Sequence, residues 1–391
     1  MAEELKPENW TVSSNEALKI SLADDDGAVQ FSPNFTYPIF GDAEQIFGYQ
    51  GLKINLAFDS VTFKPFLNVK YVKKLAAEVE DIQSKLLEFL PAQDVILNDE
   101  AKWVDKFHAE RNSFELPSDE YLITEYELDG STFVVYLVNL QDYRIKKLHR
   151  RMQIFCLLFI ESASYIDEND ANWEIFITFN KLTKQCVGYT TTYKYWHYRG
   201  AIEFNKSEKL LKRGKISQLI IFPQYQSKRH GSNLYNAVCE VWMKDPFITE
   251  ITVEDPNESF DDLRDRNDFN RLYQSGLFDT IPNELPISSK WIDKKRAEFK
   301  LDKRQFIRLI EMSLLFKKSP NFRLQVKNRL YEKNFEILSE MDDPTMRDKL
   351  RTAFQSLEKD YLRILQYLMH KKHSMVEDMN SEDVSSKKLK V

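Results

Sequence analysis

Two adjacent carboxylates, Glu254 and Asp255, stand at the end of a predicted strand, residues 251–254. An earlier apolar run, 216–222, is followed by the loop 226–231 and by a predicted helix from residue 232 to about residue 243. A strand, a compact loop and a helix in this order direct successive backbone N–H groups, and the positive end of the helix dipole, at one point. We expect a pyrophosphate to bind there, within reach of a base supplied by the two carboxylates.

The loop matches neither of the two common phosphate-binding motifs, because the sequence lacks both GxxxxGKS/T and GxGxxG. It resembles instead Gln/Arg-x-x-Gly-x-Gly/Ala, the acetyl-CoA loop of the GNAT superfamily of N-acetyltransferases. The run ITVEDPNESFDDLRDRND at 251–268 resembles the type B histone acetyltransferase catalytic subunit. So do FDSVTFKP at 58–65, EAKWVD at 100–105 and TTYKYWH at 191–197. The resemblance covers roughly residues 5–315.

The resemblance implies an α+β (mixed α/β) fold built on a GNAT acetyltransferase core. We expect the acetyl-CoA-binding catalytic domain at 116–276, an N-terminal α+β domain at 1–115 and a C-terminal helical domain at 277–373. Residues 374–391 are polar and predict a disordered tail. Apolar periodicity predicts strands at 51–58, 66–71, 131–137, 173–179 and 185–195. It predicts helices at 72–90, 144–165, 260–274 and 304–316, and another that begins at 343–344.

The resemblance also implies which residues bind acetyl-CoA. They are Leu219, Ile220, Ile221, Gln226, Ser227, Lys228, Arg229, His230, Gly231, Ser232, Asn257 and Arg266. Arg229 departs from the family, whose loop has glycine at this position. It must either avoid a positive φ or adopt one at a cost of roughly 1–2 kcal/mol. Its guanidinium would face either the phosphates, together with Lys228, or solvent. Gly231 keeps one close approach of the backbone.

Acetylation of a lysine requires that the ammonium, with a pKa of about 10.4, loses a proton. Glu254 is the expected general base, acting directly or through a water molecule. We expect desolvation at the strand end to raise its pKa, and the charge of Asp255 to raise it further. The resemblance places Glu161 near the reacting amine, although a carboxylate late in the helix 144–165 is also typical of a solvated surface. A backbone N–H of 219–221 would polarise the thioester, which the amine attacks directly.

As substrate, the resemblance implies the N-terminal tail of free, newly synthesised histone H4. The tail is expected to lie extended between two sets of residues, Asp42, Ala43 and Glu44 on one side and Trp173, Gln224 and Tyr225 on the other. Two simpler interpretations stay open. Residues 36–44 are typical of an exposed turn, and the acidic run 254–268 is typical of a solvated, salt-bridged helix start.

The net charge of −6 argues against a general nucleic-acid binder and suits a basic partner. Three cysteines and six histidines lack the spacing of a metal site, and the longest apolar run, 154–160, is far too short to span a bilayer. We therefore expect no metal, no direct DNA binding and no membrane association. The resemblance implies a cytoplasmic and nuclear protein whose partner, a WD-repeat β-propeller histone chaperone, docks near 196–204.

Two other function classes remain open from the sequence. The chain could be a non-catalytic histone-binding scaffold subunit with a GNAT fold, an interpretation that Arg229 supports. It could also be a GNAT enzyme that acts on a small amine, although the large N-terminal part and the aromatic segment 193–198 favour an extended peptide.

Overall fold

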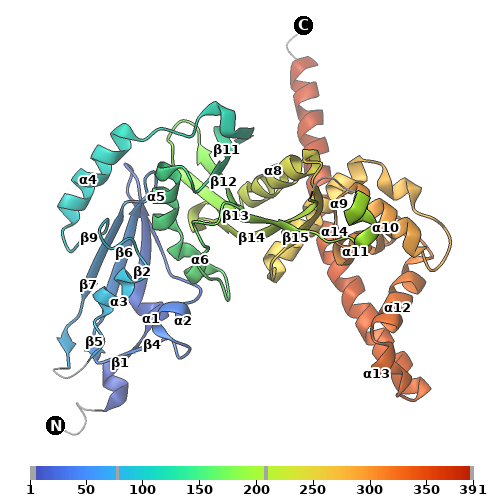
Figure 1. Cartoon of the computed structure of the whole chain (residues 1–391), viewed down its shortest axis with the longest axis horizontal. Coiled ribbons are helices and arrows are strands. Elements are labelled where there is room, and N and C mark those ends of the chain that lie inside the picture. Colours follow the sequence, from blue (N-terminus) through green and yellow to red (C-terminus); the bar gives the residue numbers. More distant parts are fainter. Residues whose placement is uncertain (1–5, 76–78, 207–209, 388–391) are drawn as a thin grey trace. The chain divides into compact units, whose positions relative to one another are not determined.

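The computed structural model describes residues 6–75, 79–206 and 210–387, and has the mixed α and β composition that was predicted (Figure 1). The chain forms two compact units. The first runs to Trp196 and also includes Gly214–Lys244. The second consists of His197–Arg213 and of the residues from Asp245 onward. This division differs from the three domains expected at 1–115, 116–276 and 277–373.

The N-terminal part of the first unit is built on a five-stranded sheet in the order β3-β2-β6-β7-β9. Its strands are β2 (Leu18–Ala23), β3 (Ala28–Phe31), β6 (Lys53–Asp59), β7 (Pro65–Lys70) and β9 (Ile96–Leu97). Strand β2 is parallel to β6 and antiparallel to β3. Two small pairs stand beside it, β1 (Thr11–Ser13) with β4 (Gln45–Phe47) and β5 (Tyr49–Gln50) with β8 (Lys73–Lys74). The helical elements here are η1 (Pro7–Trp10), α1 (Ser14–Ala17), α2 (Tyr37–Phe40), α3 (Ile82–Leu87) and α4 (Glu100–Ser113).

The helix predicted at 72–90 is wrong over most of its length. Residues 73–74 form β8, and α3 covers only Ile82–Leu87, while 76–78 lie outside the described residues. Asp81 explains the late start, because it has extended backbone angles and its side chain accepts a hydrogen bond from Gln83 N. Ile82 and Leu86 are buried as the apolar spacing indicated. The spacing therefore identified the buried face, whereas the cap determined where the helix begins.

A second sheet of this unit runs in the order β10-β11-β12-β13-β14. Its strands are β10 (Leu122–Leu128), β11 (Ser131–Asn139), β12 (Trp173–Asn180), β13 (Cys186–Trp196) and β14 (Lys212–Ile221), the last belonging to this unit from Gly214 on. The predicted hairpin is present, with Trp173 opposite Tyr193. Helix α8 (His230–Lys244) packs on β12 and β13 (Figure 1). Two short 3-10 helices, η2 (Asp119–Tyr121) and η3 (Pro223–Tyr225), precede β10 and α8.

The single helix predicted at 144–165 is instead two short helices and a loop. Helix α5 (Tyr143–Met152) is followed by α6 (Ile154–Phe159), and Ile160 returns to extended backbone angles. All five residues of 154–158 are buried, so the apolar run lies in the core. The loop after Ile160 is held by hydrogen bonds to distant elements, which the local pattern does not contain.

One hydrophobic core joins both halves of the first unit. Phe58 of β6 and Phe63, in the turn between β6 and β7, contact Phe155 of α6 at ring-centroid distances of 5.1 and 6.0 Å. Phe63 also contacts Phe222, just after β14, at 4.8 Å. Because these four rings belong to one cluster of buried side chains, residue 115 does not separate two cores.

The second unit is mainly helical, as expected for the C-terminal part. It contains α7 (Ala201–Lys206), β15 (Ile248–Val253), α9 (Glu258–Gln274), η4 (Leu277–Thr280), α10 (Ser289–Glu298), α11 (Lys303–Phe316), α12 (Phe322–Lys333), α13 (Phe335–Ser339) and α14 (Asp343–Lys387). Its core takes Phe269 and Leu272 from α9 together with residues of α11, α12 and α14, so it crosses the expected boundary at 276. Helix α14 begins at Asp343 as predicted. It continues to Lys387, where a disordered tail from residue 374 was expected.

Candidate functional site

The phosphate-binding loop predicted after β14 has the expected order of elements. Strand β14 ends at Ile221, residues 226–229 are exposed, and α8 begins at His230, two residues earlier than predicted. Ser227 and Arg229 have φ values of 61° and 68°, so Arg229 adopts the left-handed conformation that glycine would take more easily. Gly231 lies inside the first turn of the helix rather than in the loop. The amide of Asn233 donates to Arg229 O at 3.1 Å, which continues the helical pattern back to the loop.

The electrostatics of this loop suit an anion. Lys228 and Arg229 are exposed beside the N-terminus of a 15-residue helix that has no acidic residue in its first turn. The N–H groups of that turn and the helix dipole add partial positive charge at the same point. The side chain of Gln226 donates to Ile221 O at 2.9 Å, which ties the loop to the end of β14. Where residues of right-handed and left-handed backbone conformation alternate in a loop, successive backbone N–H groups point toward the same side, as in other anion-binding turns.

His230 does not present its side chain to this anion site. The ring is buried, lies 4.6 Å from the Phe133 ring and shares a 2.7 Å hydrogen bond between Nδ1 and Tyr126 Oη. Burial, assisted by the charge of Lys228, lowers the pKa of His230 to about 4, so the imidazole is neutral at pH 7. The side chain anchors the start of α8 to the sheet, and only its backbone remains available to a phosphate.

Glu161 is exposed on the loop that follows α6 rather than late in a helix. The next residue, Ser162, has a φ of 59°, and its N–H donates to Tyr37 Oη at 2.5 Å. Tyr37 is the first residue of α2, directly before the predicted substrate loop. Two residues after Ser162, the carbonyl of Ser164 accepts from Gln218 Nε2 of β14 at 2.8 Å. The structure thus brings Glu161 close to both the 36–44 segment and the strand 216–221.

Glu44 has a structural role that the sequence did not reveal. Its Oε1 accepts from the backbone N–H groups of Thr36 at 2.6 Å and Tyr37 at 3.1 Å, and its Oε2 accepts from Asn15 at 2.7 Å. These bonds cap α2 and hold Glu44 in a left-handed conformation, with a φ of 49°. The hydrogen bond from Thr36 lowers the pKa of Glu44 against the opposing effect of burial. Asp42 and Ala43, by contrast, are exposed as predicted.

Replacing Glu44 with glutamine should therefore lower stability more than it changes substrate binding. A charged acceptor makes stronger bonds to backbone N–H groups than an amide does. Since the folded-state pKa lies below the ordinary value of 4.5, this stabilisation is present above about pH 4.5 and is lost as the pH falls through the lowered pKa. Thermal unfolding of Glu44→Gln and of the exposed control Asp42→Asn, measured from pH 7 to pH 3, tests this. An equal effect of the two variants would contradict the capping role.

Trp173 and Tyr225, which were both expected to line one side of an extended tail, lie near opposite ends of the β12–β13 hairpin. Trp173 begins β12 and its ring packs on Tyr193, with centroids 4.8 Å apart. Tyr225 Oη donates instead to Gln185, at the opposite end of β13, at 3.3 Å. Eight residues of strand separate Gln185 from Tyr193, which corresponds to roughly 25 Å. Gln224 is half-buried and directly precedes Tyr225 in η3. Only a tail that is extended over roughly this length could contact both aromatic residues, so their role in substrate binding stays a prediction.

The second unit contributes Glu254 and Asp255, which follow directly after β15. Both are exposed. Asp255 has a φ of 34°, and the strained turn leads into α9. The side-chain oxygen of Asn257 caps that helix by accepting from Phe260 N at 2.9 Å. Asn257, expected to bind the cofactor, thus has a capping role in this unit.

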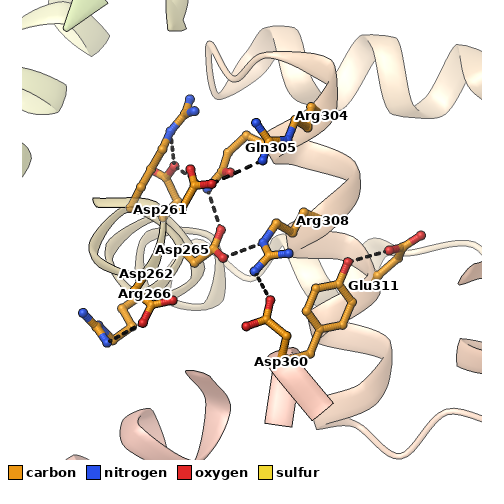
Figure 2. A network of polar contacts seen from close by, with 12 residues as sticks. Asp261, Asp262, Asp265, Arg266, Arg304, Gln305, Arg308, Glu311 and Asp360 are labelled. Carbon is orange, nitrogen blue, oxygen red and sulfur yellow. Dashed lines mark hydrogen bonds and ion pairs between the residues drawn. The ribbon is translucent and has the colours of Figure 1, made fainter. Parts of the chain in front are cut away.

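Most of the acidic residues on α9 are used in ion pairs within the second unit (Figure 2). Asp265 pairs with Arg308 of α11 at 2.5 Å, and Asp261 pairs with Arg304 at 3.2 Å. Burial raises the pKa of Asp265 to about 6 against the effect of Arg308, so the carboxylate is ionised at pH 7. The simpler interpretation of the acidic run, a salt-bridged helix, therefore applies to its part from Asp261 onward.

Arg266, a predicted cofactor ligand, contacts α14 in the structure. Its guanidinium lies 4.6 Å from the centre of the Tyr367 ring, in the geometry of a cation–π contact. A weaker ion pair joins it to Asp262 at 3.8 Å, and Asp262 also pairs with Arg363 of α14. These contacts hold α9 against the C-terminal helix α14. They do not test whether Arg266 binds the cofactor, which stays a prediction.

Comparison with known proteins gives the family. A family model described as "Histone acetyl transferase HAT1 N-terminus" matches residues 10–161, and one described as "Fungal HAT1, C-terminal" matches 265–319. The histone acetyltransferase type B catalytic subunit of Eremothecium gossypii is 59% identical over 97% of each chain, and that of Kluyveromyces lactis is 57% identical over 100% of each. The chain belongs to this family. The fission-yeast member, from Schizosaccharomyces pombe, is still 32% identical over 92% of this chain and 94% of its own.

Family membership confirms the expectation of an acetyltransferase. Among solved structures, that of Arabidopsis thaliana NAA60 in complex with acetyl-CoA covers 35% of this chain and 85% of its own, with 16% identity and a TM-score of 0.27, a likeness too low to support a conclusion. No helix among the described residues is both long and apolar enough to span a bilayer. The contacts of Tyr37 and Gln218 with the loop after α6 were not predicted. A structural role for Gln218 could have been suspected from the sequence, because this polar residue stands within the apolar run 216–222, where it is buried.

Proposed function

We propose that this protein transfers the acetyl group of acetyl-CoA to the ε-amine of lysines in the N-terminal tail of free histone H4. The observation that carries the proposal is the identity of 57–59% to histone acetyltransferase type B catalytic subunits over essentially their whole length. The exposed cationic loop before α8 supports a cofactor that contains phosphate. The chain's net charge of −6 supports a basic substrate.

The residues of the first unit suit acetyl-CoA. Its pyrophosphate would take hydrogen bonds from the first turn of α8, with Lys228 and Arg229 supplying positive charge. A backbone N–H of 219–221 would donate to the thioester oxygen as negative charge develops there. Acetyl-CoA supplies the activated acyl group, so no covalent bond to the protein is needed.

The chemical step requires one proton to leave the lysine ammonium before its nitrogen attacks. Glu254 takes that proton, directly or through water, and Asp255 and Glu161 contribute negative charge that attracts the ammonium. The nitrogen attacks the thioester carbon, and the carbon–sulfur bond breaks as the tetrahedral intermediate collapses. The nitrogen loses its second proton, and the departing thiolate of coenzyme A takes up that proton. The base returns its proton to solvent before the next turnover.

The decisive experiment compares acceptors with radiolabelled acetyl-CoA. Free histones, nucleosomes and polyamines are offered at equal lysine concentration, and transfer to each is counted. We expect free histone H4 to be acetylated fastest and nucleosomes slowly, because this acidic chain has no evident surface for DNA. Preference for polyamines would support an enzyme acting on small amines. Binding of histone without transfer would support a non-catalytic scaffold.

Arg229 offers a test of the cofactor loop. Arg229→Gly should raise thermal stability slightly, because glycine adopts the observed φ of 68° more easily, by roughly 1 kcal/mol. If the guanidinium contributes to phosphate binding, the same variant should weaken acetyl-CoA binding severalfold in calorimetry, and more so at low salt. Lys244→Ala, at the other end of α8, is the control and should change neither quantity. Unchanged affinity in Arg229→Gly would assign the guanidinium to solvent.

The proposed partner is a WD-repeat β-propeller histone chaperone that docks on the segment 196–204. Tyr198, Ile202 and Phe204 support this surface, because their side chains are 55%, 73% and 50% exposed. Such a complex would work in the cytoplasm and the nucleus. A pull-down in which Tyr198→Ala, Phe204→Ala retains the propeller as well as the unaltered chain would argue against this surface.

A further inference from the structure

Gln218 is a buried amide at the middle of β14, with only 5% of its surface exposed. Its side chain joins two elements that are distant in sequence. The Oε1 atom accepts a hydrogen bond from Thr191 Oγ1 of β13 at 3.2 Å, and Nε2 donates to Ser164 O at 2.8 Å. The neighbouring Thr190 Oγ1 donates to the backbone carbonyl of Gln218 at 2.6 Å. A buried polar group with this many partners is held in one orientation.

The segment held by Gln218 carries Glu161. Ser164 lies three residues after Glu161 on the loop that leaves α6. Its carbonyl also accepts a weak bond from Cys156 Sγ at 3.8 Å, so this point of the loop has two partners. The loop that carries Glu161 is therefore tied to β14. The next residues of β14, 219–221, are those proposed to polarise the thioester.

A second bond fixes the loop directly beside Glu161. Ser162 has a left-handed φ of 59°, a conformation that a serine adopts only where neighbouring contacts hold it. Its N–H donates to Tyr37 Oη at 2.5 Å, from the helix α2 that precedes Asp42 and Ala43. Glu161 is thus followed directly by two anchored residues, Ser162, which is bonded to the proposed substrate segment, and Ser164, which is bonded to the proposed acyl-binding strand.

We propose that Gln218 and Tyr37 are positioning residues for Glu161, and that they set the distance between its carboxylate, the acyl carbon and the incoming lysine. This inference rests on the proposed function. Neither residue touches a reacting atom, since Gln218 is buried and Tyr37 acts through the Ser162 amide. Their effect on the reaction is through the backbone of the loop, where a displacement of about 1 Å is enough to lower turnover strongly.

The test uses near-isosteric variants of the whole chain. Gln218→Met keeps the length of the side chain but removes both of its hydrogen bonds, and Tyr37→Phe removes only the acceptor of the Ser162 amide. Each should lower kcat by about tenfold or more while leaving the KM for acetyl-CoA within about twofold. Thr178→Val is the matched control, because Thr178 is fully buried in β12 and its hydroxyl has no hydrogen-bond partner among the described residues.

A double-mutant cycle separates positioning from a general loss of structure. If Gln218 acts through Glu161, Gln218→Met should lower kcat by less than about twofold when Glu161→Gln is already present. Equal losses in both backgrounds would overturn the proposal, as would a Glu161→Gln variant that keeps full turnover. Thr191→Val, which removes only the hydroxyl that donates to Gln218, should show a smaller loss with the same dependence on Glu161.

Hydrogen exchange supplies a readout that does not need activity. The amides of 160–166 should exchange at least about tenfold faster in Gln218→Met and in Tyr37→Phe than in the unaltered chain, with exchange in β12 unchanged. Unchanged exchange in this loop would overturn the anchoring role. If the unaltered chain transferred no acetyl group to any acceptor, the proposed function would fail, and this measurement would still decide whether the two residues hold the loop.

Discussion

Replacing Glu254 with glutamine should lower kcat by about a hundredfold or more while acetyl-CoA binding is retained. Removal of a general base has an effect of this size, because the lysine ammonium then has no acceptor for its proton in the transition state. Glutamine has nearly the same volume, and the side chain is exposed, so stability should change little. The acid limb of the rate–pH profile should change in the same variant.

Two comparisons make this experiment specific. Glu258→Gln is the matched control, because Glu258 is exposed only four residues later, in the first turn of α9, and is not part of the proposed chemistry. Its kcat should stay within about twofold of the unaltered chain. Near-normal turnover in Glu254→Gln would transfer the role of base to Asp255 or Glu161, whose single variants are then measured in the same assay.

Arg151→Met should destabilise the first unit by about 3–5 kcal/mol, the effect expected when one partner of a buried ionic network is removed. The Arg151 side chain is only 2% exposed. It pairs with Asp94, donates to Glu110 at 2.7 Å and donates to the carbonyl of Thr62 at 2.7 Å. Methionine would fill the space but would leave the Thr62 carbonyl without this donor and leave Asp94 and Glu110 with lysine partners alone.

The neighbouring arginine is the control for this prediction. Arg150 pairs with Glu168 at the surface, and its side chain is 47% exposed. Arg150→Met should therefore lower the free energy of unfolding, measured by chemical denaturation, by at most about 1 kcal/mol.

Since Arg151 on α5 contacts three segments before residue 115, we further expect a fragment 1–115 not to fold alone. Independent folding of that fragment would contradict a single core in the first unit.

The same network predicts how stability depends on pH. Burial raises the pKa of Asp94, but hydrogen bonds from Arg151 and Lys64 outweigh burial and lower it to about 2, from an ordinary value of 3.8. A carboxylate with a lowered folded-state pKa stabilises the fold above its unfolded pKa and loses this contribution as the pH falls. Stability should therefore fall between about pH 4 and pH 2, and this part of the fall should be smaller in Arg151→Met.

The elements that local sequence determined are those whose pattern repeats regularly. The hairpin of β12 and β13, strand β14 and the amphipathic helix α11 were predicted, because alternation or helical spacing there coincides with burial. The order of strand, loop and helix around 226–231 was predicted for the same reason. The motif at 251–268 identified the family, which the comparisons confirm.

What only the tertiary structure decided is how particular side chains are used. The helix predicted at 144–165 ends at Phe159, because a hydrogen bond from Ser162 N to Tyr37 Oη and one from Gln218 Nε2 to Ser164 O hold the following loop. Glu44 caps α2 instead of lining a cleft, since three backbone and side-chain donors converge on it only after folding. His230 enters the core for a similar reason, because its aromatic neighbours come from a distant strand pair. Sequence alone determined which residues are available for chemistry, and long-range contacts, which leave no local periodicity, determined where each of them points.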